Sequence, residues 1–287
     1  MNIWPGKKLN RWYRVLKNER HKAEAFLRER EKYCVGASGR FLGMKESRDH
    51  IWYMPGTEGE ISSLLIHSRQ ILFPVFGKNS QISAPRFLNR FLGKVYIHAL
   101  QGIRDDAECL ETFMEDLGYY AAERIEYELM SMDGALRPGT LRACPASLTL
   151  RPPLPKDEDD LFALQSAYEQ EEVLPANAVF NPAATRLNIR NIIEREQVLV
   201  AELDGQVVGK INTSAKSFTR YQIGGVYVRP DCRNLGIGSK MTAVFAEGLL
   251  AQGKGLSLFV KKRNAAACRV YRKIGFSVTA DYRITYY

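Results

Sequence analysis

Residues 233–239 have the types and spacing of a loop that binds a phosphate anion. The run Arg-Asn-Leu-Gly-Ile-Gly-Ser follows an extended apolar segment, Val226-Tyr227-Val228, and precedes a stretch with helical periodicity. Gly236 and Gly238 let the backbone approach an anion without interference from a Cβ atom. The first N–H groups of a helix are unpaired and lie at the positive end of its dipole, and Arg233 adds a fixed charge. The pattern predicts a pyrophosphate site at the start of a helix.

A second group of residues that could do chemistry lies downstream. The apolar run Leu256–Val260 predicts a buried strand, and Asn264 suits the start of a helix because its side chain can accept a hydrogen bond from the backbone. Tyr271 lies two turns later, before Gly275 and Phe276. A tyrosine phenol, with an unperturbed pKa of about 10, stays protonated at neutral pH and can donate a proton. Tyr271 is therefore a candidate general acid; the competing interpretation is a core tyrosine packed against Phe276.

These two blocks, in this order, resemble the acetyl-coenzyme A signature of the GNAT superfamily of N-acetyltransferases. The resemblance covers residues 150–287, and its specific part is 226–276. It implies an α/β fold with a mixed sheet, the GNAT acyl-CoA N-acyltransferase fold. In that fold the fourth and fifth strands splay apart and admit the pantetheine arm of acetyl-CoA, the acyl-donor co-substrate. The resemblance also gives Tyr271 the role of general acid.

The resemblance further implies which residues bind the cofactor. Backbone groups of Val226 and Val228 are expected to bind the pantetheine amides, and the N–H groups from Leu235 to Ser239 to hold the pyrophosphate. Asn264 is expected to contact the pantetheine or to cap its helix. The full expected cofactor-binding set is Val226, Tyr227, Val228, Arg233, Asn234, Leu235, Gly236, Ile237, Gly238, Ser239, Asn264 and Tyr271.

Two other phosphate-binding motifs do not fit this sequence. A dinucleotide fingerprint needs a third Gly or Ala three residues after the second glycine, where this chain has Met241. A nucleotide P-loop needs Gly-Lys-Ser/Thr, and neither Gly77-Lys78-Asn79 nor Gly253-Lys254-Gly255 completes it. Kinase and Rossmann functions are therefore set aside.

The candidate general bases lie outside the fourth strand. Many GNAT relatives place a carboxylate on the fourth strand, and the run from Tyr221 to Gly225 contains none. Glu171 and Glu172 follow the first helix of the expected catalytic domain, where they could orient a cationic amine or relay its proton through water. The alternative is a solvated helix end. Glu202, on the second strand, is a weaker candidate.

Composition sets the broad class of the protein. The chain has 287 residues, of which 45% are hydrophobic and 25% charged, so we expect a globular protein with two domains. It has no apolar run of the ~18 residues that a membrane span needs, and the segment from Met1 to Gly6 lacks the apolar core of a signal peptide. A cytoplasmic location follows as an expectation. The five cysteines have no Cys-x-x-Cys spacing, so neither a disulfide nor a metal site is expected.

Positive charge is concentrated near the N-terminus. Residues 7–32 carry ten Lys and Arg against four Glu, and apolar residues such as Trp12, Leu16 and Phe26 recur at helical spacing. We interpret this segment as an amphipathic helix with a solvated basic face, in preference to a membrane or RNA contact. Nucleic acid is therefore not the expected partner, and the net charge of +9 would also attract the phosphates of coenzyme A.

Proline and glycine between residues 132 and 155 predict a domain boundary, with one domain at 1–140 and the catalytic GNAT domain at 141–287. The second domain is expected to begin with a strand at 147–151. A helix headed by Asp157, a helix capped by Asn181-Pro182 and a hairpin turning at Asp204-Gly205 follow. Strands at 221–228 and 256–260, with a helix after each, and closing strands at 276–278 and 282–286 complete the predicted order.

The first domain is interpreted as a degenerate GNAT-like α/β domain with a basic N-terminal helix. Its predicted strands are 33–35, 51–54, 61–66, 71–76 and 94–99, and a helix is expected from Ala107. Residues 100–106 take the place of the phosphate loop in this interpretation. They contain one glycine, Gly102, and two acids, Asp105 and Asp106, so this domain is not expected to bind acetyl-CoA.

The function expected from the resemblance is transfer of an acetyl group from acetyl-CoA to a primary amine of a small molecule or peptide, by direct attack on the thioester. A non-catalytic acyl-CoA sensor or partner-binding protein is the alternative, because the strand carboxylate is missing. Aminoacyl transfer from tRNA is disfavoured, since it would leave the coenzyme A loop without a purpose. The acceptor, the length of the acyl group and the oligomeric state are not encoded in recognisable motifs.

Overall fold

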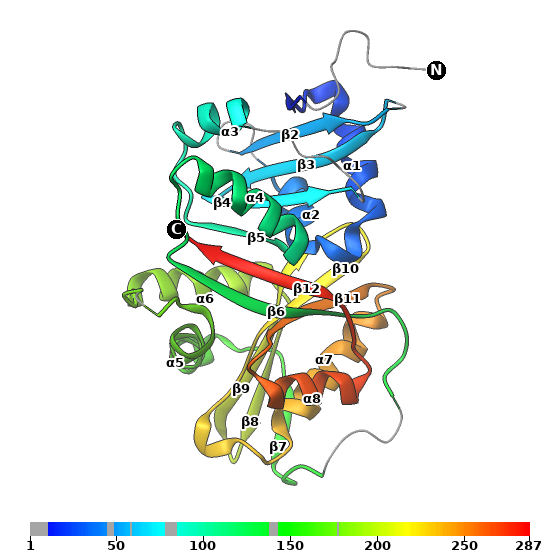
Figure 1. The fold of residues 1–287 in the computed structure, drawn as a ribbon. Helices are drawn as coiled ribbons and strands as arrows, with labels where there is room; N and C mark the ends of the chain where they lie inside the picture. Colours follow the sequence, from blue (N-terminus) through cyan, green and yellow to red (C-terminus); the bar gives the residue numbers. More distant parts are fainter. Residues whose placement is uncertain (1–10, 45–48, 58, 78–84, 138–142, 177) are drawn as a thin grey trace. The chain divides into compact units, whose positions relative to one another are not determined.

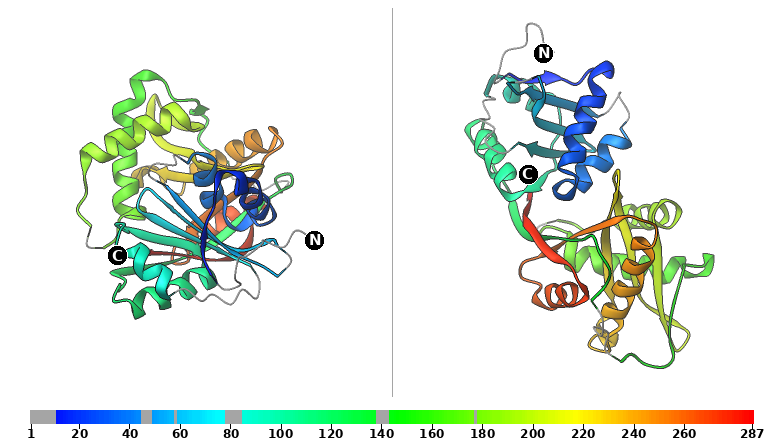
Figure 2. Two further views of the ribbon diagram at one scale, coloured as in Figure 1. Left: turned by 90° about the horizontal axis from the view of Figure 1, so that it is seen from above. Right: turned by 90° about the vertical axis from the view of Figure 1, so that its right-hand side faces the viewer.

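The computed structural model describes residues 11–287 except 45–48, 58, 78–84, 138–142 and 177. The chain divides into two compact units, Met1–Leu129 with Thr279–Tyr287, and Met130–Val278 (Figures 1 and 2). The boundary predicted after residue 140 falls inside the second unit, and residues 279–287 cluster with the first.

The second unit has the element order that the sequence predicts. Strand, two helices, three strands, helix, strand and helix follow one another, and the last strand of the chain begins in this unit. The elements are β7 (Leu148–Arg151), α5 (Glu158–Tyr168), α6 (Pro182–Arg195), β8 (Val198–Leu203), β9 (Gln206–Lys216), β10 (Arg220–Val228), α7 (Ile237–Leu250), β11 (Gly255–Lys261), α8 (Ala265–Ile274) and β12 (Ser277–Tyr286). The strand order, with the end of β6 (Glu123–Met132), is β6-β11-β10-β9-β8-β7.

Local sequence signals explain several of these boundaries. Asn181 accepts a hydrogen bond from the backbone N of Ala184 at 3.1 Å, and Pro182 occupies the first helical position of α6. Asp204 and Gly205 have φ angles of 50° and 78°, as a tight hairpin between β8 and β9 requires. The predicted cap and hairpin are both confirmed.

Helices cover both faces of the second unit's sheet (Figure 1). One core cluster joins α7 and α8 to alternate strand residues such as Ala201 and Val208, and another joins α5 and α6 to their neighbours Val200 and Val207. Because successive side chains of a strand point to opposite faces, each strand contributes to both cores.

Strand β10 lies between unlike neighbours. It is antiparallel to β9, and it is parallel to β11 over only three residue pairs, from Arg220↔Gly255 to Gln222↔Ser257. Register shifts interrupt the pairing with β9 after Gln222 and again between Gly224 and Tyr227, and Gly225 within the second shift has φ +59°. Within the described residues, β10 and β11 are thus paired at one end and unpaired at the other.

The first unit repeats this order of elements. A hairpin, a strand, a helix, a strand, a helix and a strand follow one another as β2 (His50–Pro55), β3 (Ile61–Ser68), β4 (Ile71–Phe76), α3 (Pro85–Leu92), β5 (Ala99–Ile103), α4 (Arg104–Asp116) and β6. Strands β4 and β5 are parallel over only two pairs, Ile71↔Ala99 and Leu72↔Leu100. The strand order is β1-β2-β3-β4-β5-β12-β6, where β1 is Tyr13–Arg14, so the last strand of the chain lies between β5 and β6 (Figures 1 and 2).

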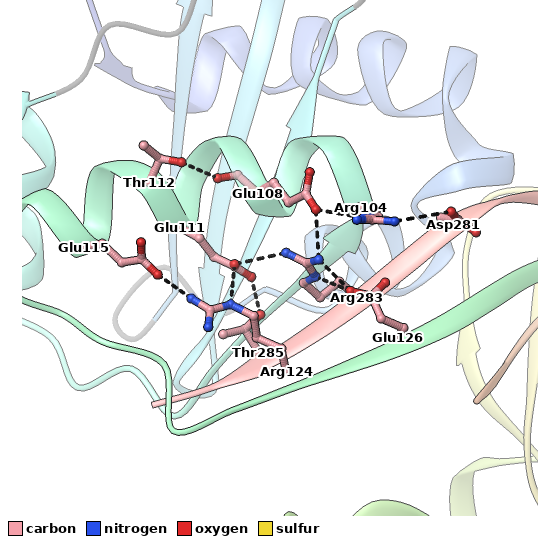
Figure 3. Close-up of polar contacts among 10 residues, drawn as sticks. All are labelled: Arg104, Glu108, Glu111, Thr112, Glu115, Arg124, Glu126, Asp281, Arg283 and Thr285. Atoms are coloured by element: carbon pink, nitrogen blue, oxygen red, sulfur yellow. Dashed lines mark hydrogen bonds and ion pairs between the residues drawn. The ribbon is translucent and has the colours of Figure 1, made fainter. Parts of the chain in front are cut away.

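An ionic cluster around Arg283 holds β12 in the first unit (Figure 3). The Arg283 guanidinium donates to Glu126 of β6 at 2.6 Å and to Glu108 and Glu111 of α4 at 2.8 and 3.2 Å. The Thr285 hydroxyl donates to Glu111, and Arg124 also binds Glu111 at 2.8 Å. Since the Arg283 side chain is only 10% exposed, its charge depends on these carboxylates.

Several sequence predictions in the first unit were wrong. The segment 33–35 is not a strand, because a helical turn at Glu31–Tyr33 leads into helix α2 (Val35–Leu42). Its short apolar run fits a buried helix as well as a strand. The strand predicted at 94–99 begins only at Ala99, and the strand β6 was not predicted although its apolar and polar residues alternate.

The basic segment 7–32 does not form one helix over its described residues. It contains β1, a short turn at Lys17–Glu19 and helix α1 (Arg20–Glu29), while residues 7–10 lie outside the described part. Trp12 is 6% exposed and belongs to the core of the first unit. Its burial therefore comes from tertiary packing and not from the apolar face of a helix. The closing strands predicted at 276–278 and 282–286 form one strand, β12.

The phosphate-loop position assigned to residues 100–106 in the first unit was also wrong. Helix α4 follows β5 as α8 follows β11, so the counterpart of α7 is α3, which follows β4. Gly102 lies inside β5, where a Cβ atom would be 3.2 Å from the Pro74 carbonyl oxygen. The counterpart of the phosphate loop therefore follows β4, and residues 78–84 of that connection lie outside the described residues.

Candidate active site

The connection between β10 and α7 presents unpaired backbone N–H groups. Gly236 caps α7 in the left-handed conformation, with φ +78°, and Asn234 has φ +66°. The first hydrogen bond of the helix runs from the N–H of Lys240 to the carbonyl of Gly236, at 3.0 Å. In the part of the chain that the structure describes, the N–H groups from Leu235 to Ser239 donate to no protein acceptor. This geometry suits an anion such as a pyrophosphate.

Arg233 lies at the entrance of this connection and is held from three sides. Its Nε donates to the Val228 carbonyl at 3.0 Å, and its two Nη atoms donate to Glu171 Oε1 and Oε2 at 3.0 and 2.8 Å. The guanidinium carbon lies 5.2 Å from the centre of the Tyr227 ring, and the Tyr227 hydroxyl donates to Glu171 at 3.1 Å. The Arg233 hydrogen bonds hold the pKa of Glu171 below its usual value.

Backbone groups of Val228 point away from β9. Tyr227 pairs with Lys210, and the N–H of Arg229 donates to the Val208 carbonyl at 2.8 Å. Because hydrogen-bonding direction alternates along a strand, the intervening Val228 presents its backbone groups on the β11 side. The pairing with β11 has already ended there, so an extended ligand chain could be bound between the two strands.

Asn264 caps α8, one of the two roles expected of it, and it also binds Glu172. Its Oδ1 accepts from the N–H of Ala267 at 3.1 Å, which caps α8, and its Nδ2 donates to Glu172 Oε1 at 3.0 Å. Lys261 Nζ lies 3.8 Å from the other oxygen of Glu172. The structure therefore brings Glu172, which is distant in sequence, to the start of α8.

Tyr271 is buried in α8, with 8% of its surface exposed. Burial raises the pKa of its phenol well above the usual value, and the charges of Tyr168 and Glu172 act in the same direction. The phenol is therefore protonated at any physiological pH. Its ring also packs edge-on against Phe276, with 6.0 Å between ring centres. The core contact that the sequence suggested is therefore present, and the phenol also keeps its proton.

Glu171 and Glu172 lie in a single π-helical turn, Glu169–Val173, that follows α5. Such turns are frequent at functional sites. Glu169, in the same turn, accepts from Gln165 and Asn188 at 2.8 Å each. Glu202 instead accepts from Arg151 at 2.6 Å, which commits it to an ion pair elsewhere on the sheet.

Lys210 is a site residue that the sequence analysis missed. It is fully buried on β9, and its Nζ donates to Asn212 Oδ1 and to the Gly225 carbonyl, at 3.0 Å each. The Nζ also lies 5.1 Å from the centre of the Tyr168 ring. Burial lowers the pKa of this lysine to about 7, with Glu169 opposing the shift. The available signal was a single lysine inside the apolar run Val207–Ile211.

Among the residues described, no group of three or more His, Cys, Asp or Glu side chains is placed to hold a metal ion. The five cysteines, all of which lie in the described part of the chain, form no disulfide with one another. No helix in the described ranges is both long and apolar enough to cross a membrane.

The parting of β10 from β11 and the unpaired N–H groups of the glycine-rich helix start lie in the same segment of the chain. Residues 160–276 match the model of the "Acetyltransferase (GNAT) family". The chain therefore contains a GNAT domain, which confirms the resemblance stated from the sequence. Members of this family transfer acyl groups from acyl-CoA.

Solved structures share the fold over nearly the whole chain. A GCN5-related N-acetyltransferase from Sphaerobacter thermophilus is 17% identical with a TM-score of 0.59, covering 96% of this chain and 94% of its own. A tandem GNAT protein from the clavulanic acid biosynthesis pathway is 12% identical with a TM-score of 0.58, covering 96% and 97%. A Drosophila protein is 10% identical with a TM-score of 0.67, covering 96% and 98%. These likenesses confirm the fold class, including the GNAT-like first half. A search of curated protein sequences gives no match.

Proposed function

We propose that this protein is an acetyl-CoA-dependent N-acetyltransferase that acts on a primary amine of a small molecule or peptide. The observation that carries the proposal is the juxtaposition of the unpaired N–H groups at Leu235–Ser239 with the parting of β10 and β11 beyond Gln222. The first suits a pyrophosphate and the second suits the pantetheine arm, and both lie inside the matched GNAT domain.

The chain's own residues would then divide the work. Bound acetyl-CoA supplies a thioester carbonyl for attack by the amine and a thiolate leaving group that needs a proton. Tyr271 would donate that proton, because burial keeps its phenol protonated. Backbone groups of Val226 and Val228 would hold the pantetheine, and Arg233 would face the pyrophosphate.

The proton of the attacking amine needs a separate acceptor, since β10 carries no carboxylate between Tyr221 and Gly225. Glu171 and Glu172 remain the proposed carboxylates for orienting the amine or relaying its proton through water. Glu172 is the better placed of the two, because its charge acts on Tyr271 and its oxygen is held by Asn264. Glu171 is already engaged by Arg233 and Tyr227.

A second function, that of a non-catalytic acyl-CoA sensor, is supported by two observations. The three carboxylates of the π-helical turn are each bound to side chains of the same chain, and the strand carboxylate of many relatives is absent. A sensor would bind acetyl-CoA through the same loop but would release no coenzyme A when amines are added.

The test is coenzyme A release from acetyl-CoA, followed with a thiol reagent over a panel of polyamines, amino acids and peptides. We expect turnover with the wild type and a fall in kcat of about 10²- to 10⁴-fold in Tyr271→Phe, with unchanged binding of acetyl-CoA by calorimetry. Tyr53→Phe, a buried tyrosine in the first unit, is the matched control. Binding without turnover for every amine would support the sensor, and no binding at all would overturn both functions.

A further inference from the structure

Strand β10 has a bulge shortly after Gln222, the last residue that it pairs with β11. Gly224 pairs with Asn212 and Tyr227 pairs with Lys210, so Gly225 and Val226 together lie opposite the single residue Ile211 of β9. Gly225 has φ +59°, a left-handed conformation that is unfavourable for a residue with a side chain. A bulge bends its strand and increases the local twist, so it keeps the following residues of β10 out of the register with β11 that ends at Gln222↔Ser257.

Two side chains of β9 fill the space behind this bulge. A Cβ atom on Gly225 would lie 2.1 Å from Asn212 Oδ1 and 2.7 Å from Lys210 Nζ, so glycine is required by the close approach as well as by its φ angle. Asn212 is itself oriented by a hydrogen bond from its Nδ2 to the Thr213 carbonyl at 2.9 Å. The Gly225 carbonyl therefore faces a preformed donor, Lys210 Nζ, at 3.0 Å.

A lysine is an unusual choice for this buried position. An ammonium group without a counter-ion is costly in a protein interior, and Lys210 makes hydrogen bonds only to neutral oxygens. The titratable groups around it are Tyr168 of α5, Glu169 of the following turn and Tyr227, its partner on β10. A neutral amine still donates two hydrogen bonds, enough for Asn212 and Gly225, so either protonation state can hold the bulge.

We propose that Lys210 is a positioning residue for the pantetheine arm: by donating to the Gly225 carbonyl it fixes the bulge that separates β10 from β11 and leaves the backbone of Val226 open to the ligand. This inference rests on the proposed function, since it assigns a support to the same cofactor site. The inference distinguishes two parts of that site. Lys210 supports the strand that would bind the pantetheine, whereas the pyrophosphate would be held at the start of α7.

The test compares two ligands in three proteins by isothermal titration. Coenzyme A carries both the pantetheine and the diphosphate, and adenosine 3′-phosphate 5′-diphosphate carries only the nucleotide part. In Lys210→Met, which keeps an unbranched chain without donors, we expect the Kd of coenzyme A to rise about tenfold, as loss of one buried hydrogen bond would give. The Kd of the nucleotide should be unchanged. Lys216→Met, an exposed lysine further along β9, should change neither value.

The outcomes separate this inference from the proposed function. If wild type binds neither ligand, both are overturned. If wild type binds and Lys210→Met retains its coenzyme A affinity, or loses affinity for both ligands equally, Lys210 has no specific role at the arm. Should Lys210→Met fail to fold, Lys210→Gln is used, because its neutral amide still donates to Gly225. That variant is expected to keep a preference for coenzyme A over the nucleotide, and loss of the preference would contradict the proposal.

Discussion

Arg233 and Glu171 form a two-pronged ion pair, with Nη1···Oε1 and Nη2···Oε2 distances of 3.0 and 2.8 Å, although they lie 62 residues apart in the sequence. The cation expected to attract a pyrophosphate is thus neutralised by a carboxylate of the turn that follows α5. Parallel, bidentate pairing of this kind is stronger than a single contact. A diphosphate ligand and Glu171 must therefore share or compete for the same guanidinium.

Removing the Glu171 charge is expected to strengthen binding of acetyl-CoA. In Glu171→Gln the Kd should fall about three- to tenfold, because Arg233 no longer has a competing anion and the pair is only partly exposed. Titration calorimetry at constant ionic strength measures the change. The control is Asp231→Asn, which breaks the neighbouring Arg229–Asp231 pair and should leave the Kd unaltered. Weaker binding in Glu171→Gln would mean that this carboxylate supports the cofactor site.

Alanine at the two glycines of the loop should have different effects. Gly238 has no positive φ, and a Cβ there would lie 3.6 Å from Val228 Cγ2, an ordinary contact. Gly238→Ala should therefore keep the Tm of the free protein while raising the Kd of acetyl-CoA at least tenfold, since the methyl would face the ligand. Gly236→Ala should also lose about 1–2 kcal/mol of stability, because Gly236 has φ +78°. Equal Tm losses, or an unchanged Kd in Gly238→Ala, would contradict this use of the loop.

The Arg283 cluster predicts a large stability difference between a buried and an exposed ion pair. Arg283→Met leaves Glu111, whose side chain is 5% exposed, with less compensation for its charge, and should lower the free energy of unfolding by about 3–5 kcal/mol. Arg28→Met removes an exposed pair with Glu24 on α1 and should cost about 0–1 kcal/mol. Urea unfolding measures both. Similar small losses would show that β12 is held by its strand pairing alone.

Asp106 predicts a pH effect in the first unit. Burial raises its pKa to about 7, although the Phe76 N–H donates to its carboxyl at 2.9 Å. The folded protein therefore binds more protons than the unfolded chain between an ordinary aspartate pKa and about 7, so this group lowers stability as pH rises through that window. Asp106→Asn can still accept from Phe76 and should remove that loss.

The measurement for Asp106 is the difference in unfolding free energy between the variant and the wild type at pH 5 and pH 8. We expect the difference to shift in favour of Asp106→Asn by on the order of a few kcal/mol at the higher pH. A difference that does not change with pH would show that the carboxyl is charged in the folded protein throughout. Asp105→Asn, at the adjacent and less buried position, provides the comparison.

Much of the second unit could be predicted because its signals are local. The Asp204-Gly205 turn, the Asn181 and Asn264 caps and the left-handed Gly236 depend on residues within a few positions of one another. The elements of the first unit were harder to predict from the sequence. The segment 33–35 has no local feature that separates a strand from a buried helix, and the choice of α2 depends on what packs against it. The position of the first unit's phosphate-loop counterpart required the strand order.

The sequence by itself determined the GNAT-type order of elements and the glycine-rich helix start. It also singled out Tyr271 as a candidate general acid or core tyrosine. Only the tertiary structure decided that Glu171 binds Arg233, that Lys210 is buried against the Gly225 bulge, and that β12 lies between β5 and β6. The physical reason is the range of the interactions. Caps, turns and hydrophobic periodicity act between neighbours in the chain, whereas ion pairs, burial and strand pairing join residues that approach one another only when the chain has folded.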